Sequence, residues 1–142
     1  MSGKIDWKTD ANNILMGVAT HDATLFDASY KVAKLFEITF INSNNEKVRF
    51  RLTGVKKIRV EDFLDGMVIL NIFVWPVATL DFNLASGYGW KKLFGFLRTE
   101  DDIRRSAERI VKSFPNANLV QFSGSDGGEI SVICDQMDVE VL

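Results

Sequence analysis

The sequence predicts an α+β fold, in which a mostly antiparallel β-sheet or sandwich carries one long amphipathic helix. Two observations lead to this prediction. Short apolar stretches separated by turn residues recur along most of the chain, and several alternate apolar with polar side chains, as strands with one buried face do. One segment, residues 99–114, instead repeats its apolar side chains at helical spacing.

Length and composition suit a single domain spanning residues 1–142. Hydrophobic residues make up 46% of the chain and charged residues 25%, and eleven Phe side chains supply bulk for a core. Residues 1–12 are polar and lack periodicity. We therefore expect them to form a flexible arm or one weak helical turn.

The first half of the chain predicts several strands. Two short strands, 14–19 and 23–30, are expected on either side of His21 and Asp22. A hairpin is expected next, because segments 34–42 and 47–53 both alternate and the Asn-Ser-Asn-Asn sequence between them favours a turn. The side chains expected to face inward from this hairpin are Phe36, Ile38, Phe40, Val48, Phe50 and Leu52.

Glycine and proline interrupt the segments that follow. Gly54 predicts a bulge or bend before a further strand at 55–60. The apolar run 68–75 is typical of a strand covered on both faces, and Pro76 should end or kink it. Beyond it we expect an edge strand at 78–84, a loop at 86–89 and a strand at 92–97.

The helix has both a start signal and a stop signal. Thr99 is the expected N-cap, followed by three acids that suit the helix dipole, and Pro115 ends the segment. The expected buried stripe consists of Ile103, Ala107, Ile110, Val111 and Phe114. The opposite face offers the i,i+4 pairs Glu100/Arg104, Asp101/Arg105 and Glu108/Lys112. A final hairpin is expected from 118–123 and 129–135, followed by a short strand at 139–142.

Composition also argues against several classes of protein. The net charge of −2 is too small to indicate nucleic acid or a membrane surface. Cys134 is the single cysteine, so neither an intramolecular disulfide nor a thiolate metal cluster is expected. The start lacks the apolar core of a secretory signal, and the longest apolar stretch, 67–80, is too short to span a bilayer. We expect a cytoplasmic protein without a membrane partner.

No pattern in the chain predicts catalysis, a cofactor or a metal site. His21 is the only histidine, and with Asp22 and Cys134 or a serine it could form a catalytic set, although no nucleophile motif accompanies it. We interpret it instead as a histidine at the start of a strand, whose ring bonds a backbone carbonyl. The glycines at 86–92 lack P-loop spacing, and residues 125–129 lack the alternating acids of a calcium loop.

Charge is unevenly distributed along the sequence. Residues 47–59 hold six basic residues and no acid, whereas residues 113–142 hold five acids and no base. Both segments could simply be solvated strand faces. Alternatively, the basic segment could contact nucleic acid, or the acidic one could capture a basic protein. The candidate partner-binding residues of the acidic segment are Asp126, Glu129, Asp135, Asp138 and Glu140.

Several short motifs resemble a known family. The motif His21-Asp22-Ala23, two following strands, Leu52-Thr53-Gly54-Val55 and the Ser/Gly-rich segment from Ser123 to Cys134 are similar to those of an immunity-protein family of bacterial polymorphic toxin loci. It is the family numbered fifty in that nomenclature. The resemblance covers roughly residues 20–75 and 118–142.

This resemblance implies a cytosolic protein, not an enzyme, that binds and neutralises a cognate toxin domain. Two other hypotheses stay open at this point. One is a small nucleic-acid-binding module that uses the basic hairpin 47–59, and the other is an enzyme built on His21.

Overall fold

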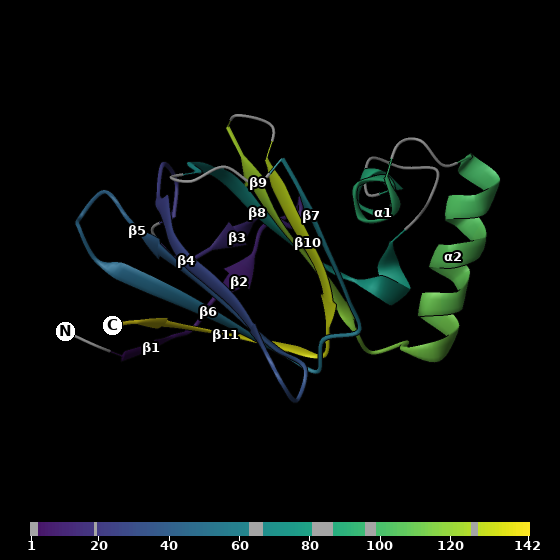
Figure 1. Ribbon diagram of the computed structural model, residues 1–142, viewed down its shortest axis with the longest axis horizontal. Helices are drawn as coiled ribbons and strands as arrows, with labels where there is room; N and C mark the ends of the chain where they lie inside the picture. Colours follow the sequence, from purple (N-terminus) through teal and green to yellow (C-terminus); the bar gives the residue numbers. More distant parts are fainter. Residues whose placement is uncertain (1–2, 19, 63–66, 81–86, 96–98, 126–127) are drawn as a thin grey trace.

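A computed structural model describes residues 3–18, 20–62, 67–80, 87–95, 99–125 and 128–142. The described elements form three layers: one antiparallel sheet, a second antiparallel sheet behind it, and a layer of helices on the far side of the second sheet (Figure 1). This arrangement confirms the predicted α+β class with its mostly antiparallel strands. No described helix combines the length and apolar character needed to cross a membrane.

The first sheet has five antiparallel strands. Its spatial order is β1 (Gly3–Ile5), β11 (Gln136–Val141), β6 (Lys47–Thr53), β5 (Leu35–Ile41) and β4 (Thr24–Lys31). The predicted β5–β6 hairpin is confirmed, and the Asn42 side-chain oxygen accepts hydrogen bonds from the backbone N–H groups of Asn44 and Glu46. The first and last strands, β1 and β11, are paired and lie side by side (Figure 1).

The second sheet has four antiparallel strands, and a small two-stranded ribbon accompanies it. The order is β7 (Lys57–Glu61), β10 (Glu129–Cys134), β9 (Asn118–Gly124) and β8 (Ile69–Pro76), and the ribbon consists of β2 (Lys8–Thr9) and β3 (Leu15–Met16). The final hairpin is confirmed as β9 and β10, and the last strand, β11, begins at Gln136, earlier than expected.

The bend predicted at Gly54 is a change of sheet. Gly54 has φ +65° and lies between β6 of the first sheet and β7 of the second. A Cβ atom at this position would collide with the Asp135 side chain, including its Cβ atom at 2.8 Å. Asp135 itself lies where the chain crosses back from β10 to β11. The two crossings therefore pass close to each other, and glycine is required for both backbone conformation and space.

The main core lies between the two sheets. Phe40 and Phe50 from the first sheet and Phe122 from the second contact one another, with ring centroids 5.4 to 5.9 Å apart. The inward-facing residues predicted for the β5–β6 hairpin all lie in this core and are 5% exposed or less. Alternation was thus sufficient to identify the buried face of that hairpin.

A second apolar cluster joins the helices to the outer face of the second sheet. It includes Trp75 and Leu119 from the sheet, Trp90 from α1 (Gly87–Phe94) and Ile103 from α2 (Glu100–Ser113). The Thr99 side chain accepts a hydrogen bond from the Asp102 N–H at 3.2 Å, which confirms the N-cap. Of the expected stripe, Ile103 and Ala107 are buried, Ile110 and Val111 are half-buried, and Phe114 is exposed.

Several expectations were wrong. Residues 3–5 and 8–9 form β1 and β2 in place of an arm or helical turn, because β1 pairs with the distant strand β11 and β2 pairs with the nearby strand β3. Residues 77–79 form a short 3-10 helix after Pro76, and residues 87–94 form α1 where a loop and a strand were expected. In the segment expected as a strand at 14–19, only Leu15–Met16 is a strand among the described residues 14–18. The remaining parts of the expected elements, residues 19, 81–84, 86 and 96–97, lie outside the described residues.

The ion pairs on α2 also differ from the expected i,i+4 set. Arg105 pairs with Asp102, three residues before it, and Glu100 pairs with Lys91 of α1. The helix therefore uses part of its first turn to contact its neighbour.

Candidate protein-binding surface

Two of the residues considered for catalysis, His21 and Cys134, are far apart. The His21 Nδ1 atom lies 3.4 Å from the Leu70 carbonyl oxygen, as expected for a ring that bonds the backbone. Cys134 of β10 lies opposite Asn118 of β9, which in turn lies opposite Pro76 of β8. Pro76 is six residues along β8 from Leu70, so the two ends of this strand are separated by about 20 Å. Cys134 is fully buried, and burial raises the pKa of its thiol to about 12. A nucleophilic pair of these residues is therefore not formed.

The five acids considered for partner binding do not form one surface. Glu129 lies on the outer face of the second sheet, Asp138 and Glu140 lie on the outer face of the first, and Asp135 lies at the crossing between them. Asp126 is outside the described residues. The cause is the change of sheet at Asp135, which the sequence pattern did not reveal. Among the described residues, no group of three or more His, Cys, Asp or Glu side chains could hold a metal ion.

Glu129 is held in a buried ion pair under α1. The Lys92 Nζ atom lies 2.6 Å from the Glu129 carboxylate, and the two side chains are only 15% and 10% exposed. Burial raises the pKa of Glu129, while the contact with Lys92 opposes this effect. Its other carboxylate oxygen is buried without a hydrogen-bond partner. Glu129 is therefore part of the contact between sheet and helix rather than a surface residue.

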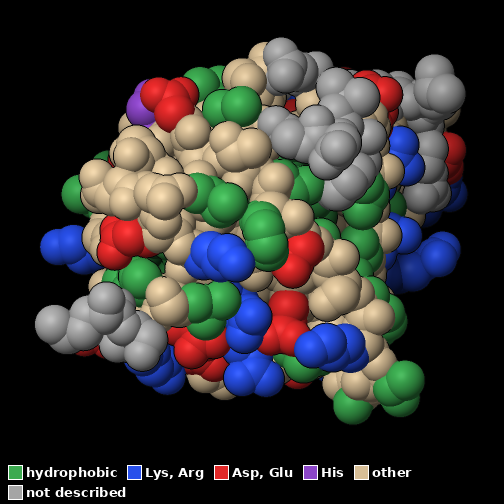
Figure 2. All heavy atoms as spheres, turned by 60° about the vertical axis from the view of Figure 1, so that its left-hand side comes forward, with side chains coloured by type: hydrophobic (Ala, Val, Ile, Leu, Met, Phe, Trp, Pro, Cys, Tyr) green, Lys and Arg blue, Asp and Glu red, His purple; other side chains and the backbone are tan. Residues whose placement is uncertain are grey.

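Residues 47–53 of the basic segment and residues 136–141 of the acidic segment lie side by side on the first sheet. Strand β11 pairs with β6, which places Asp138 opposite Arg51 and Glu140 opposite Arg49. Arg49 also approaches Glu140 to 3.7 Å. The charges that are segregated in the sequence are thus interleaved in the fold, and Figure 2 shows positive and negative side chains mixed over one face of the molecule.

Glu37, on β5, pairs with basic side chains of both neighbouring strands on this charged face. Its side chain is 11% exposed and receives an ion pair from Lys31 of β4 and another from Arg51 of β6, at 3.2 Å in the second case. The hydrogen bond from Lys31, with the positive charges of Lys31, Arg51 and Arg49, holds the pKa of Glu37 below its ordinary value against the opposing effect of burial.

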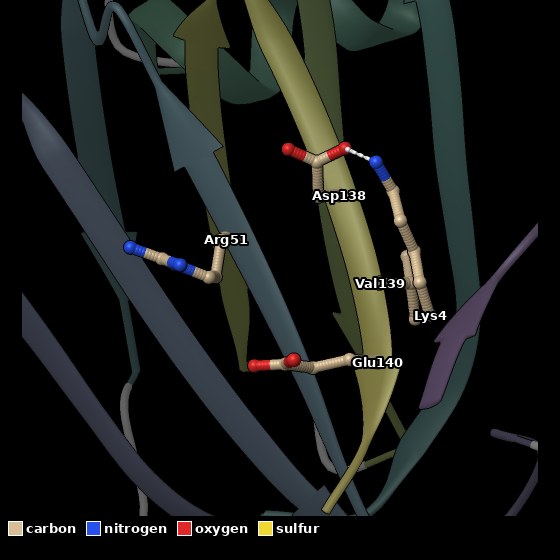
Figure 3. Close-up of a pocket in the computed structure, with 5 residues that line it drawn as sticks. All are labelled: Lys4, Arg51, Asp138, Val139 and Glu140. Carbon is tan, nitrogen blue, oxygen red and sulfur yellow. Dashed lines mark ion pairs between the residues drawn. The ribbon is translucent and has the colours of Figure 1, made fainter. Parts of the chain in front are cut away.

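A shallow pocket of about 160 Å³ is lined by residues of β1, β11 and β6 (Figure 3). Its charged side chains are Lys4, Arg51, Asp138 and Glu140. Lys4 reaches Asp138 at 3.1 Å, while Arg51 and Glu140 point to the other side (Figure 3). Because its charges are paired with one another or with neighbours, this pocket offers little unbalanced charge to a ligand.

The basic side chains of hairpin 47–59 are engaged in contacts within the protein. Their partners are Phe26 for Lys47, Glu140 and Glu37 for Arg49, Glu37 for Arg51, Asp135 and Phe114 for Lys56, Phe94 for Lys57, and Glu61 for Arg59. These residues also divide between the two sheets. No specific observation therefore favours the nucleic-acid hypothesis.

Exposed apolar side chains occur instead at the β4–β5 hairpin. Val32 at its tip is 96% exposed, and Tyr30 near the end of β4 is 57% exposed. Tyr30 lines a depression of about 390 Å³, whose other described residues are Val55, Lys56, Lys57 and Ile58. The hairpin is held against this segment, because the Val55 N–H donates to the Lys34 carbonyl.

The tip of this hairpin also has an unusual backbone. Ala33 and Lys34 have φ values of +73° and +60°, a region that favours glycine and costs other residues about 1 kcal/mol each. The sequence Val32-Ala33-Lys34 contains none of the usual turn residues and therefore gives no turn signal. An apolar residue between two alternating strands was the signal that could have located it.

Comparison of the chain with protein-family models, curated proteins and solved structures found no match.

Proposed function

We propose that this protein binds another protein through the β4–β5 hairpin and, as its short motifs suggest, that the partner is a bacterial toxin domain that it neutralises. The observation that carries the proposal is the exposure of Val32 and Tyr30 beside the depression formed with residues 55–58. Neutralisation would follow if the bound protein covered the toxin's active site.

Physical costs support a binding role for this hairpin. A valine-sized side chain placed in water forgoes roughly 1.5–3 kcal/mol of stabilisation that burial would give. The left-handed conformations of Ala33 and Lys34 add strain in the same place. Aromatic and aliphatic anchors that enter a partner's pocket are typical of residues that dominate binding energy. A protein partner that buried Val32 and Tyr30 would recover the cost of exposing them.

Co-purification and a growth assay test this function. The chain is expressed together with the protein encoded by the gene next to its own, and binding and relief of toxicity are measured. We expect a stable complex and restored growth. The double variant Val32→Ser/Tyr30→Ser should weaken the complex by about a hundredfold, as the loss of two anchor residues would.

Leu70→Ser provides the matched control. Leu70 is 45% exposed, on β8 of the second sheet, so its replacement removes a similar apolar side chain at another place. This variant should bind like the unchanged protein. Absence of a complex and of growth protection with the unchanged protein would refute the toxin-neutralising function. An equal loss in the Leu70→Ser variant would refute the assignment to the β4–β5 hairpin.

A further inference from the structure

We infer that an extended, acidic segment of the partner pairs as an additional strand with the free edge of β4. This inference rests on the proposed function. In the described part of the chain, β4 is the last strand of the first sheet, and its outer edge meets another strand only at the isolated bridge between Thr24 and Val68. An edge strand with unpaired backbone groups is the usual site of strand addition.

The direction of the free backbone groups follows from the ladder. The Asn42 N–H donates to Glu46, and therefore residues of β5 that are in phase with Asn42, including Ile38 and Phe36, direct their backbone groups toward β6. Their partners on β4, Ala28 and Tyr30, then direct their own N–H and C=O groups away from β5. These two residues offer donors and acceptors spaced for an additional strand.

Side chains beside this edge provide an apolar surface. Tyr30 lies opposite Phe36, a core residue, and so faces the interior side of the first sheet. It lines the depression together with Val55 and Ile58, where the end of β4 approaches the start of β7 (Figure 1). Val60 of β7 is 48% exposed although it lies opposite the core residue Ile130. A strand beside β4 could place alternate apolar side chains against these groups.

The charges around this edge indicate which side chains the other face of the incoming strand should carry. Four lysines surround this end of the β4–β5 hairpin and the depression: Lys31, Lys34, Lys56 and Lys57. Two carboxylates balance them in part, since Glu37 pairs with Lys31 and Asp135 with Lys56. The described lining of the depression contains no acid. An excess of positive charge remains, and an acidic segment complements it.

The test compares two variants with matched controls. Ala28→Pro removes an outward-facing N–H and should leave the ladder with β5 intact, because proline is tolerated on an edge strand in that orientation. Lys34→Glu reverses one rim charge, and Lys8→Glu reverses an exposed charge on β2 as its control. Two probes are used: the protein encoded by the neighbouring gene, and peptides of about six residues that alternate Glu and Val or Lys and Val.

We expect the partner and the Glu–Val peptide to bind the unchanged protein and to protect the amides of Ala28 and Tyr30 from hydrogen exchange. Ala28→Pro should weaken both by about tenfold or more, and Lys34→Glu should weaken both by about fivefold at low salt. Lys8→Glu should change neither. Thermal unfolding of each variant verifies that it is folded. If Ala28→Pro does not fold, Lys34→Glu is the decisive variant.

Other outcomes separate this inference from the proposed function. If the partner binds all variants equally, strand addition at β4 is wrong and the function stands. If the partner does not bind but the Glu–Val peptide binds with the expected sensitivities, the function is wrong and the surface stands. Equal binding of the Lys–Val peptide would overturn the acidic preference. Dimerisation of the unchanged protein that Ala28→Pro abolishes would identify a second copy of this chain as the occupant.

Discussion

At the scale of single residues, Glu37 shows how the fold changes the role of a side chain. Alternation placed it on the polar face of β5, yet long basic side chains from β4 and β6 cover it until only 11% of the side chain is exposed. Because the protein holds its pKa below the ordinary value of 4.5, the folded state favours the charged carboxylate more than the unfolded chain does. The charged Glu37 side chain therefore stabilises the folded protein at pH values above 4.5.

The first prediction concerns the pH dependence of this contribution. Glu37→Gln should lower the free energy of unfolding by about 1–2 kcal/mol near neutral pH, since its cationic partners are partly exposed. The difference from the unchanged protein should shrink as pH falls below about 4.5 and through the lowered pKa, where Glu37 itself becomes protonated. Denaturant titrations over this range measure it. Glu108→Gln, on the exposed face of α2, is the control for the loss of a surface carboxylate.

At the scale of elements, local signals predicted some parts of the fold and not others. Local sequence signals specify both the β5–β6 hairpin and α2. The hairpin has alternating strands around an asparagine-rich turn, and the helix has a capping threonine and an apolar stripe. Neither depends on distant residues for its type. Both were therefore predictable from the sequence.

The helix α1 was missed because its glycines serve a tertiary contact. Gly87 and Gly89 disfavour a helix by propensity, so the segment resembled a loop. A Cβ atom at Gly89 would lie 2.9 Å from the Trp75 ring and 3.1 Å from Leu119, so the absence of a side chain lets the helix approach the second sheet. Trp90, Leu93 and Phe94, all buried, are spaced as on one helical face, a signal that the glycines obscured.

The second prediction concerns the attachment of α1 to the sheet. Lys92→Met should cost about 3–5 kcal/mol, because it leaves the Glu129 carboxylate buried without the cation that lies 2.6 Å from it. The pKa of Glu129, which burial already raises, should rise further. Adding Glu129→Leu should recover most of the loss, since an apolar pair can replace a buried ion pair. A double variant no more stable than Lys92→Met would show that the pair itself is not what holds α1.

At the scale of the whole molecule, strand order determines the electrostatic surface. The basic segment 47–53 and the acidic segment 136–141 are more than eighty residues apart in the sequence, but they become neighbouring strands β6 and β11. Sequence alone contains no local signal for this pairing, so two opposite fields were expected where the fold has one neutralised face. The sequence favoured the acidic segment as the interface, whereas the structure favours the lysine-rimmed edge of β4.

The last prediction tests whether these acids serve the fold rather than a partner. The double variant Asp138→Lys/Glu140→Lys would place positive charges opposite Arg51 and Arg49 and beside Lys4. Like charges in cross-strand pairs destabilise a sheet, so the free energy of unfolding should fall by about 1–2 kcal/mol at low salt and by less at about 0.15 M ionic strength. Glu108→Lys, exposed on α2, should change it by no more than about 0.5 kcal/mol. Binding to the neighbouring gene's product, measured on the folded fraction, should be unaffected by the double variant. Unchanged stability together with lost binding would show that Asp138 and Glu140 belong to the interface with the partner.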